Sequence, residues 1–204
     1  MAETEEKPTL ILICGSPRTT GYSARLMNFA AEGAEKAGVN VEKCFVADYS
    51  ITPCHGCDSC MVTGECIYTG EDTDDFDLVE EYLEEGDGAM LFAPLYFAGP
   101  PAMLKCLYDR FQPYWVRRYV HKEEFPPKRP LQQFIIGAGN DPFGAEPFVA
   151  ITKSAFNVFG FKTEAVHDFI GYGQPEFYER STEMEQKAYQ AGFDFAQQLL
   201  AAKE

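Results

Sequence analysis

Four of the seven cysteines in the chain lie close together, with the spacing Cys54-x2-Cys57-x2-Cys60-x5-Cys66. Thiolates at three-residue intervals can bind one face of an iron–sulfur cluster, and a fourth thiolate after a short loop completes a set of four ligands. Zinc sites more often pair two separated Cys-x2-Cys units, so the spacing fits zinc less well. The odd total of cysteines also argues against a disulfide framework. We therefore interpret this segment as a metal or redox site.

A second group of polar residues lies in the segment Gly15-Ser-Pro-Arg-Thr-Thr-Gly-Tyr-Ser23, which follows a short apolar run and precedes a helical pattern. Its two glycines permit a tight turn, Arg18 offers a guanidinium suited to phosphate, and the following helix offers N–H groups and a positive dipole end. The segment matches neither the nucleotide-triphosphatase loop nor the dinucleotide Gly-x-Gly-x-x-Gly turn. The single phosphate of a mononucleotide fits it better. Its hydroxyl donors are Ser16, Thr19, Thr20 and Ser23.

Apolar runs typical of strands alternate with segments of helical periodicity along the chain. The expected strands are 10–14, 41–46, 88–94, 134–137 and 163–166. The expected helices are 23–37, 74–85, 101–111, 147–159 and 181–203. Strands joined through helices require right-handed crossovers and a parallel sheet. The pattern therefore predicts one α/β domain over residues 1–204, with a doubly wound five-stranded parallel sheet and helices on both faces.

Residues 112–130 do not fit this alternation. The segment contains Trp115, Arg117 and Arg118 together with several prolines, and it is basic within an acidic chain. We predict an irregular, basic and aromatic surface insertion, and the alternative interpretation is a structured loop or a dimer contact.

Charge and hydropathy exclude several classes of protein. The formal net charge of −15 argues against nucleic-acid binding, because phosphate recognition needs a basic face. No apolar run approaches the ~20 residues that a membrane-spanning helix requires, so we expect no membrane insertion. The first residues, Met1-Ala-Glu-Thr-Glu-Glu-Lys7, are acidic where a signal peptide would be basic, and we expect a cytoplasmic protein.

Three motifs resemble those of the flavodoxin-like, NAD(P)H-dependent FMN reductase family. Gly15-Ser-Pro-Arg-x-x-Gly-x-Ser-x-x-Leu26 is similar to the FMN phosphate loop of that family. Ala93-Pro-Leu-Tyr-Phe-Ala-Gly-Pro100 resembles the family's second flavin loop, and Leu104-Lys105 followed by Asp109-Arg110 completes the set. The resemblance extends from about Thr9 to Ala201 and implies a flavodoxin-like fold with bound FMN.

The resemblance assigns three loops to FMN. The first would hold the FMN phosphate, the second would wrap the isoalloxazine ring, and a loop after the fourth strand would approach that ring. Backbone N–H groups would stabilise the anion formed on reduction, so no catalytic side chain is expected, and the three histidines carry no predicted role. Tyr22 departs from the small polar residue common in the family. The implied FMN-binding residues are Ser16, Arg18, Gly21, Tyr22, Ser23, Ala24, Pro94, Leu95, Tyr96, Phe97, Gly139 and Asn140.

The cysteine spacing is similar to the compact motif of iron–sulfur flavoproteins, a branch of this family that binds a 4Fe–4S cluster. Other flavodoxin-like oxidoreductases carry a similar segment without a cluster, and Gly56-Cys57 and Thr63-Gly64-Glu65-Cys66 fit that pattern too. Ile67 rather than proline follows the last cysteine, so the bacterial ferredoxin module is absent. Three hypotheses stay open: a 4Fe–4S cluster on the four cysteines, a cluster-free thiol loop, and a zinc site.

The resemblance implies two alternative functions. The first is an FMN-dependent oxidoreductase that passes electrons from NAD(P)H to a small acceptor such as a quinone or free flavin. The second is an iron–sulfur flavoprotein that carries electrons between protein partners such as ferredoxin. Either protein would form a homodimer or homotetramer, because flavins of the family lie at a subunit edge. Residues 65–87 contain no Lys or Arg and many acidic residues, which we interpret as a solvated helix face, with docking of a basic redox partner as the alternative.

Overall fold

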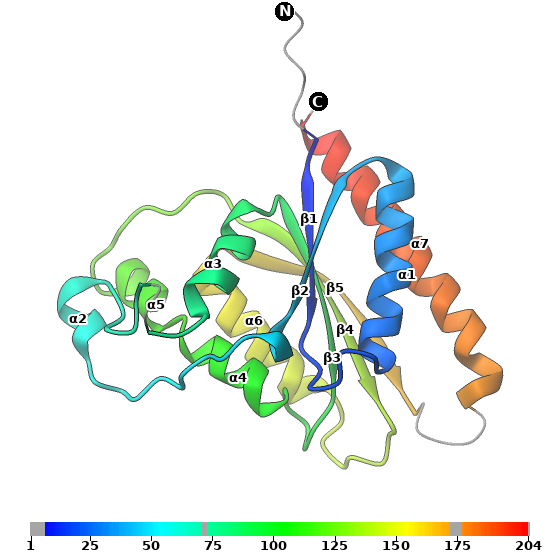
Figure 1. The fold of residues 1–204 in the computed structure, drawn as a ribbon, viewed down its shortest axis with the longest axis horizontal. Helices are drawn as coiled ribbons and strands as arrows, with labels where there is room; N and C mark the ends of the chain where they lie inside the picture. The colour runs from blue at the N-terminus through cyan, green and yellow to red at the C-terminus, as the bar shows by residue number, and fades with distance from the viewer. Residues whose placement is uncertain (1–6, 71–72, 172–176, 204) are drawn as a thin grey trace, which may run out of the picture.

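In a computed structural model, which describes residues 7–70, 73–171 and 177–203, five parallel strands form one sheet in the order β2-β1-β3-β4-β5 (Figure 1). The central strands β1 and β3 are buried on both faces, as their continuous apolar sequences predict. The predicted doubly wound parallel sheet is confirmed. The strands are β1 (Thr9–Cys14), β2 (Asn40–Phe45), β3 (Gly88–Pro94), β4 (Arg129–Gly137) and β5 (Phe161–Ile170).

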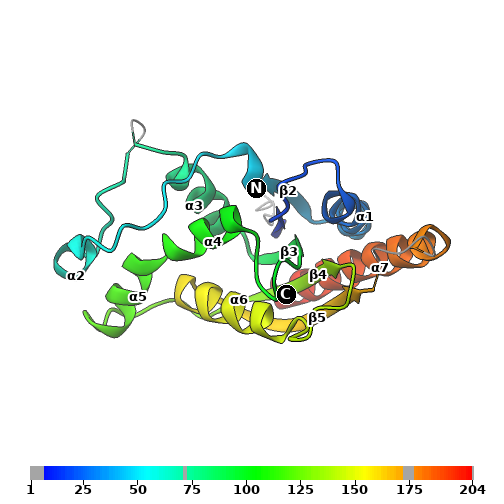
Figure 2. The same ribbon diagram turned by 90° about the horizontal axis from the view of Figure 1, so that it is seen from below.

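Helices cover both faces of the sheet, as predicted (Figures 1 and 2). On one face α1 (Tyr22–Ala37) packs against α7 (Phe177–Lys203), and on the other lie α3 (Phe76–Glu85), α4 (Ala102–Asp109) and α6 (Glu146–Phe159). A hydrophobic core lies on each face of the sheet. Alternate residues of β1 pack into the two cores, because successive side chains of a strand point to opposite faces. One core contains Ile11 and Ile13, and the other contains Leu10 and Leu12.

A smaller group of elements lies outside the sheet and its two helical layers. A short 3₁₀ helix, η1 (Val46–Asp48), follows β2, and the chain then forms a long excursion that contains α2 (Ser59–Thr63). This excursion contacts α5 (Gln112–Tyr119) beyond the layer of α3 and α4 (Figures 1 and 2). Within the described residues, none of the helices combines the length and apolar character needed to cross a membrane.

The structure differs from the predicted elements mainly in α5, β4, β5 and α7. β4 begins at Arg129, five residues before the predicted position 134, because its first residues pair with β3 and β5. Residues 112–119, predicted to be irregular, form α5, because Pro113 lies in the first turn, where a proline is well tolerated. β5 extends to Ile170, well beyond the predicted 163–166, since this edge strand alternates buried and exposed residues and lacks a continuous apolar run. α7 begins at Phe177, ahead of the predicted Ser181.

Candidate functional site

Three loops start side by side at the carboxyl edge of the sheet. Cys14 at the end of β1 pairs with Phe92 of β3, and Pro94 at the end of β3 pairs with Ile136 of β4, so the three strands end close together. The chain leaves β1 for β2 on one side and reaches β3 on the other, so this edge contains the switch in strand order where such sheets bind ligands (Figure 1). The three loops and their adjoining strand and helix ends contain every residue predicted to bind FMN.

The loop between β1 and α1 packs tightly against α4. A Cβ atom at Gly15 would lie 2.5 Å from Leu104 Cδ2, so a side chain there would displace α4. Ser16 is buried, and its Oγ accepts a hydrogen bond from the backbone N–H of Arg18 at 3.1 Å. No side chain caps α1 at its N-cap residue Gly21. Because the first N–H groups of a helix lack intrahelical partners, this loop and helix end suit a phosphate.

The loop after β3 makes a strained tight turn. Tyr96 and Gly99 exchange two backbone hydrogen bonds of 3.0 Å each. Between them Phe97 (φ 50°) and Ala98 (φ 57°) both adopt the left-handed conformation, in a turn that favours Asn and Gly. Each such non-glycine residue costs about 1–2 kcal/mol, and the Phe97 side chain is fully exposed. Strain and an exposed aromatic ring at a sheet edge indicate a functional loop.

The loop after β4 approaches the same edge. It also contains left-handed residues, Gly139 (φ 89°) and Asn140 (φ 67°), and the N–H of Gly171 ties it to the end of β5 by donating to Gly137 O at 2.8 Å. Phe143 in this loop is largely exposed. Aromatic side chains beside a turn that suits a phosphate would fit a flat ring carrying a phosphate, as in FMN.

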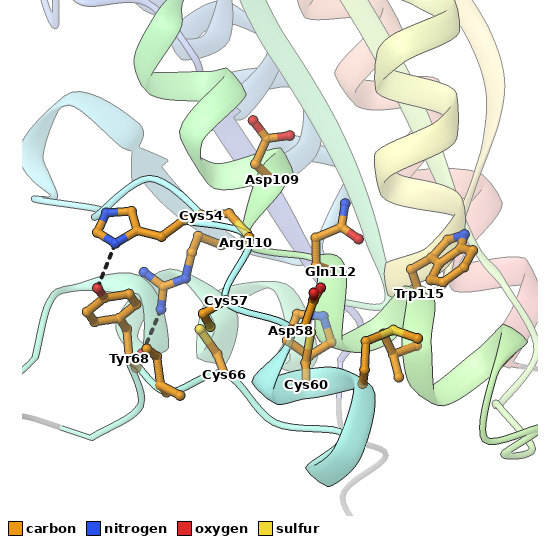
Figure 3. Close-up of a pocket in the computed structure, with 16 residues that line it drawn as sticks. Cys54, Cys57, Asp58, Cys60, Cys66, Tyr68, Asp109, Arg110, Gln112 and Trp115 are labelled. Atoms are coloured by element: carbon orange, nitrogen blue, oxygen red, sulfur yellow. Dashed lines mark hydrogen bonds between the residues drawn. The ribbon is translucent and has the colours of Figure 1, made fainter.

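The four cysteines predicted as metal ligands line one cavity of about 310 Å³ (Figure 3). The cavity lies between the cysteine loop (residues 54–66) and the chain around the junction of α4 and α5. Cys54 and Cys57 are exposed, Cys60 and Cys66 are partly buried, and all four thiols are free. Other lining residues include His55, Tyr68, Asp109, Arg110, Gln112 and Trp115.

The four thiols are the donor type that iron–sulfur clusters use. Among the residues that the structure describes, no three His, Cys, Asp or Glu side chains form a group that could hold one metal ion. In a 4Fe–4S cluster each of four cysteines binds its own iron, so the four sulfurs surround a larger object. Burial, and next the neighbouring Cys54, raises the pKa of Cys60, so this thiol is protonated at neutral pH and would have to lose its proton to bind a metal.

Arg110, the C-cap residue of α4, is buried beside this cavity with 1% of its side chain exposed. Its Nη2 donates to Tyr68 O at 2.6 Å (Figure 3). Its Nη1 donates to Thr52 O at 3.1 Å, and Arg110 also forms an ion pair with Asp74. Burial alone would raise the pKa of Asp74, but hydrogen bonds from Phe76 N, Arg110 and Thr52 N outweigh burial and lower that pKa. The ends of the cysteine loop are therefore anchored on a buried ion pair.

Several residues of the cavity were not predicted from the sequence. His55 has no predicted role, yet its Nδ1 lies 2.8 Å from the Tyr68 hydroxyl oxygen and shares a hydrogen bond with it. Trp115 belongs to the segment predicted as a separate insertion, but it lines the cavity with the cysteines. The sequence signal that could have pointed to Arg110 was the pair Asp109-Arg110, which ends the helix that follows the second flavin loop.

The fold and the loops at its carboxyl edge define a flavodoxin-like domain of the flavin-reductase type. A family model described as NADPH-dependent FMN reductase matches residues 8–162, and the chain belongs to that family.

Curated relatives carry a more specific name. The chain is 34% identical over 102 residues to an iron–sulfur flavoprotein of Archaeoglobus fulgidus, a match covering 50% of this chain and 44% of that protein. It is 36% identical over 104 residues to an iron–sulfur flavoprotein of Methanocaldococcus jannaschii, covering 51% of this chain and 52% of that protein. The chain thus spans about half the length of the curated relatives it matches.

Solved structures share the fold at low sequence identity. A flavone reductase matches with a TM-score of 0.70 and 16% identity, covering 96% of this chain and 64% of that chain. An NAD(P)H:quinone oxidoreductase from Methanothermobacter marburgensis matches with a TM-score of 0.64 and 17% identity, covering 93% of this chain and 97% of that chain.

Proposed function

We propose that this protein is an iron–sulfur flavoprotein, an oxidoreductase that binds FMN at the carboxyl edge of its sheet and a 4Fe–4S cluster at its cysteine loop, and exchanges electrons with a redox protein. The observation that carries the proposal is that all four cysteines of the loop line one cavity. The names of the curated relatives support it.

In the proposed FMN site each loop has its own task. Ser16 and Arg18, with the first turn of α1 from Gly21 to Ala24, hold the phosphate through hydroxyl, guanidinium and backbone N–H donors. The segment Pro94–Phe97 and the pair Gly139-Asn140 cover the ring and present backbone N–H groups to its edge. When bound, FMN supplies the redox chemistry by taking up a hydride or electrons at its ring. The proposal therefore assigns no side chain as nucleophile or general base.

In the proposed cluster site the thiolates of Cys54, Cys57, Cys60 and Cys66 are the ligands. α4 links this site to the flavin loop, because it begins just after the turn Tyr96–Gly99 and its C-cap residue lines the cavity. At 1.5 Å per residue its eight residues extend over about 12 Å. One short, rigid helix thus holds the two proposed sites at a fixed separation.

The proposed partner follows from charge. A net charge of −15 attracts a redox protein with a basic face and raises the rate of encounter. We also propose a homo-oligomer, in which a second copy covers the exposed rings of Phe97 and Phe143 beside the flavin loops. Light scattering tests this part, and a monomeric mass would contradict it.

A second candidate function is NAD(P)H-dependent reduction of a small acceptor such as a quinone or free flavin. The match to the NADPH-dependent FMN reductase family favours it. In this case NADPH or NADH would deliver a hydride to FMN at the open edge of the sheet, and the cysteine loop would serve no essential step.

Anaerobic assays on the purified protein distinguish the two functions. The first predicts rapid electron exchange with reduced ferredoxin and little oxidation of NADH or NADPH when a quinone or FMN is the acceptor. Rapid NAD(P)H turnover with a small acceptor, without exchange with ferredoxin, would instead support the second. Failure of the protein to bind FMN would contradict both.

A further inference from the structure

Arg110 has one N–H group without a partner. Its Nη1 and Nη2 are bonded, but Nε is buried and finds no hydrogen-bond acceptor among the described residues. Leaving a buried donor unsatisfied costs about 1–3 kcal/mol, and more when the group is charged. Arg110 lines the same cavity as the four cysteines, and its side chain is 1% exposed. Several buried polar side-chain atoms lack a partner among the described residues, and Arg110 Nε is the one whose residue lines the cysteine cavity.

The two bonded nitrogens of Arg110 hold opposite ends of the cysteine loop. Thr52, whose carbonyl binds Nη1, lies two residues before Cys54, and Tyr68, whose carbonyl binds Nη2, lies two residues after Cys66. Asp74 strengthens this junction, because it pairs with Arg110 and its Oδ2 accepts a hydrogen bond from Thr52 N at 2.9 Å. One guanidinium thus fixes the separation between the first and last thiols of the set.

We propose that Arg110 is the positioning residue of the metal group on the cysteine loop: its Nη atoms hold the loop closed, and its Nε–H donates a hydrogen bond to a sulfur of that group. This inference rests on the proposed 4Fe–4S site. A hydrogen bond and a positive charge beside a cluster sulfur stabilise the more negative, reduced state. Arg110 therefore slows loss of the cluster and makes its reduction potential less negative.

Arg129 offers a matched control. It is another partly buried arginine, and its Nη1 donates to the carbonyls of Leu83, Glu84 and Gly86 at 2.6–3.0 Å. Its guanidinium lies over the ring of Phe161, with 4.1 Å between Cζ and the ring centroid. It does not line the cysteine cavity. Arg129→Lys removes the same kind of guanidinium–carbonyl anchor without touching the cysteine loop.

The test compares wild type, Arg110→Lys and Arg129→Lys, all purified without oxygen. Iron and FMN per chain, the lifetime of the cluster in an iron chelator and its midpoint potential are measured. We expect Arg110→Lys to keep FMN, to lose iron at least about tenfold faster than wild type, and to have a more negative potential. Arg129→Lys keeps the wild-type lifetime and potential. The same lifetime and potential in Arg110→Lys as in Arg129→Lys would overturn the proposal.

Two further measurements keep the test decisive. If Arg110→Lys does not fold, the double variant Arg110→Gln/Asp74→Asn, which removes both charges of the pair, is measured in the same way and the same losses are expected. If wild type holds no iron, the cluster and the proposed hydrogen bond to its sulfur both fail. Amide hydrogen exchange then tests loop closure alone: residues 53–67 should exchange at least about tenfold faster in Arg110→Lys than in Arg129→Lys, and equal rates would overturn that part too.

Discussion

Cys60 and Cys106 are both partly buried free thiols, but only Cys60 lines the cavity shared by the cysteine loop and Arg110. The difference between them is therefore one of surroundings and not of residue type. Three other thiols and a buried cation accompany Cys60, whereas Cys106 lies on α4 outside this set. This pair gives the proposed cluster a direct test at the level of a single atom.

Cys60→Ser is expected to abolish most iron binding, because a serine hydroxyl is a poor substitute for a thiolate in a cluster. Cys106→Ser should retain wild-type iron and sulfide. Both variants should keep FMN at the wild-type ratio, since neither residue belongs to the proposed flavin loops. Iron, sulfide and flavin analysis of the three proteins checks this, and equal iron in both variants would contradict the assignment of Cys60 as a ligand.

Asp74 gives a prediction for the pH dependence of stability. Its pKa is lowered in the folded protein, so its ionised form stabilises the fold above the ordinary carboxyl pKa of about 3.9, and this stabilisation is lost as pH falls below that value. Asp74→Asn, which leaves Arg110 buried without its partner, should lower the free energy of unfolding by about 3 kcal/mol at pH 7.

The difference between Asp74→Asn and wild type should begin to shrink below about pH 4, where the Asp74 carboxyl of the unfolded chain takes up a proton, and should shrink further as the pH falls through the lower pKa of the folded protein. Asp109→Asn is the control, because its ion pair with Lys105 is largely exposed and should contribute less than about 1 kcal/mol. Urea unfolding at several pH values measures these differences. A constant deficit of Asp74→Asn from pH 7 to pH 3 would contradict the role of the charge.

Single residues were predictable from the sequence where a motif places them in one loop. The four cysteines and the polar residues after β1 belong to such motifs, and the structure brings each group together. Arg110 and Trp115 were not found as members of the cavity, because tertiary packing joins segments more than forty positions apart, as in the bond from Arg110 to Tyr68. Sequence spacing carries no signal for such a contact.

Among the elements, the turn Tyr96–Gly99 is the clearest case of strain at a proposed site. Phe97 has a left-handed backbone and a fully exposed ring. The ring therefore contributes little to the packing of this chain, and the conformation has a cost without a gain in stability. Binding of the flavin ring would supply the missing contact.

Two substitutions of Phe97 distinguish the effect of its strained backbone on stability from the effect of its aromatic ring on FMN binding. Phe97→Gly should raise the free energy of unfolding of the flavin-free protein by about 1 kcal/mol, since glycine adopts the left-handed conformation freely. Phe97→Ala should not, because alanine keeps the strain. Both should weaken FMN binding through loss of the ring. Urea unfolding and a flavin fluorescence titration measure the two effects, and wild-type FMN affinity in both variants would contradict a role of Phe97 at the flavin.

The central strands of the sheet were predictable because β1 and β3 are continuous apolar runs, which indicate buried strands without any knowledge of the neighbouring elements. α5 was not, because several prolines in residues 112–130 favour irregular structure, whereas Pro113 in fact lies in the first helical turn, where proline is well tolerated. β5 was predicted too short, because its alternating burial resembles neither a buried strand nor a helix. In both cases the local sequence is ambiguous, and packing against neighbouring elements determines the secondary structure.

For the whole molecule, the net charge affects the rate of encounter with other proteins more than it affects the fold. With a net charge of −15, exchange with a basic redox protein should depend steeply on salt. The second-order rate should fall roughly tenfold between low salt and about 0.3 M, where the screening length is only a few ångström. Stopped-flow measurement over this range, with a neutral quinone as the control acceptor, checks it. A salt-independent rate would contradict electrostatic docking.

If one chain carries both a flavin and an iron–sulfur cluster, the visible absorption spectrum of protein purified without oxygen contains both chromophores. We expect the two flavin bands superimposed on a broad sulfide-to-iron charge-transfer absorption, with the latter absent from Cys60→Ser. Flavin bands alone in the wild-type protein would contradict the cluster and leave a flavin reductase with a metal-free cysteine loop.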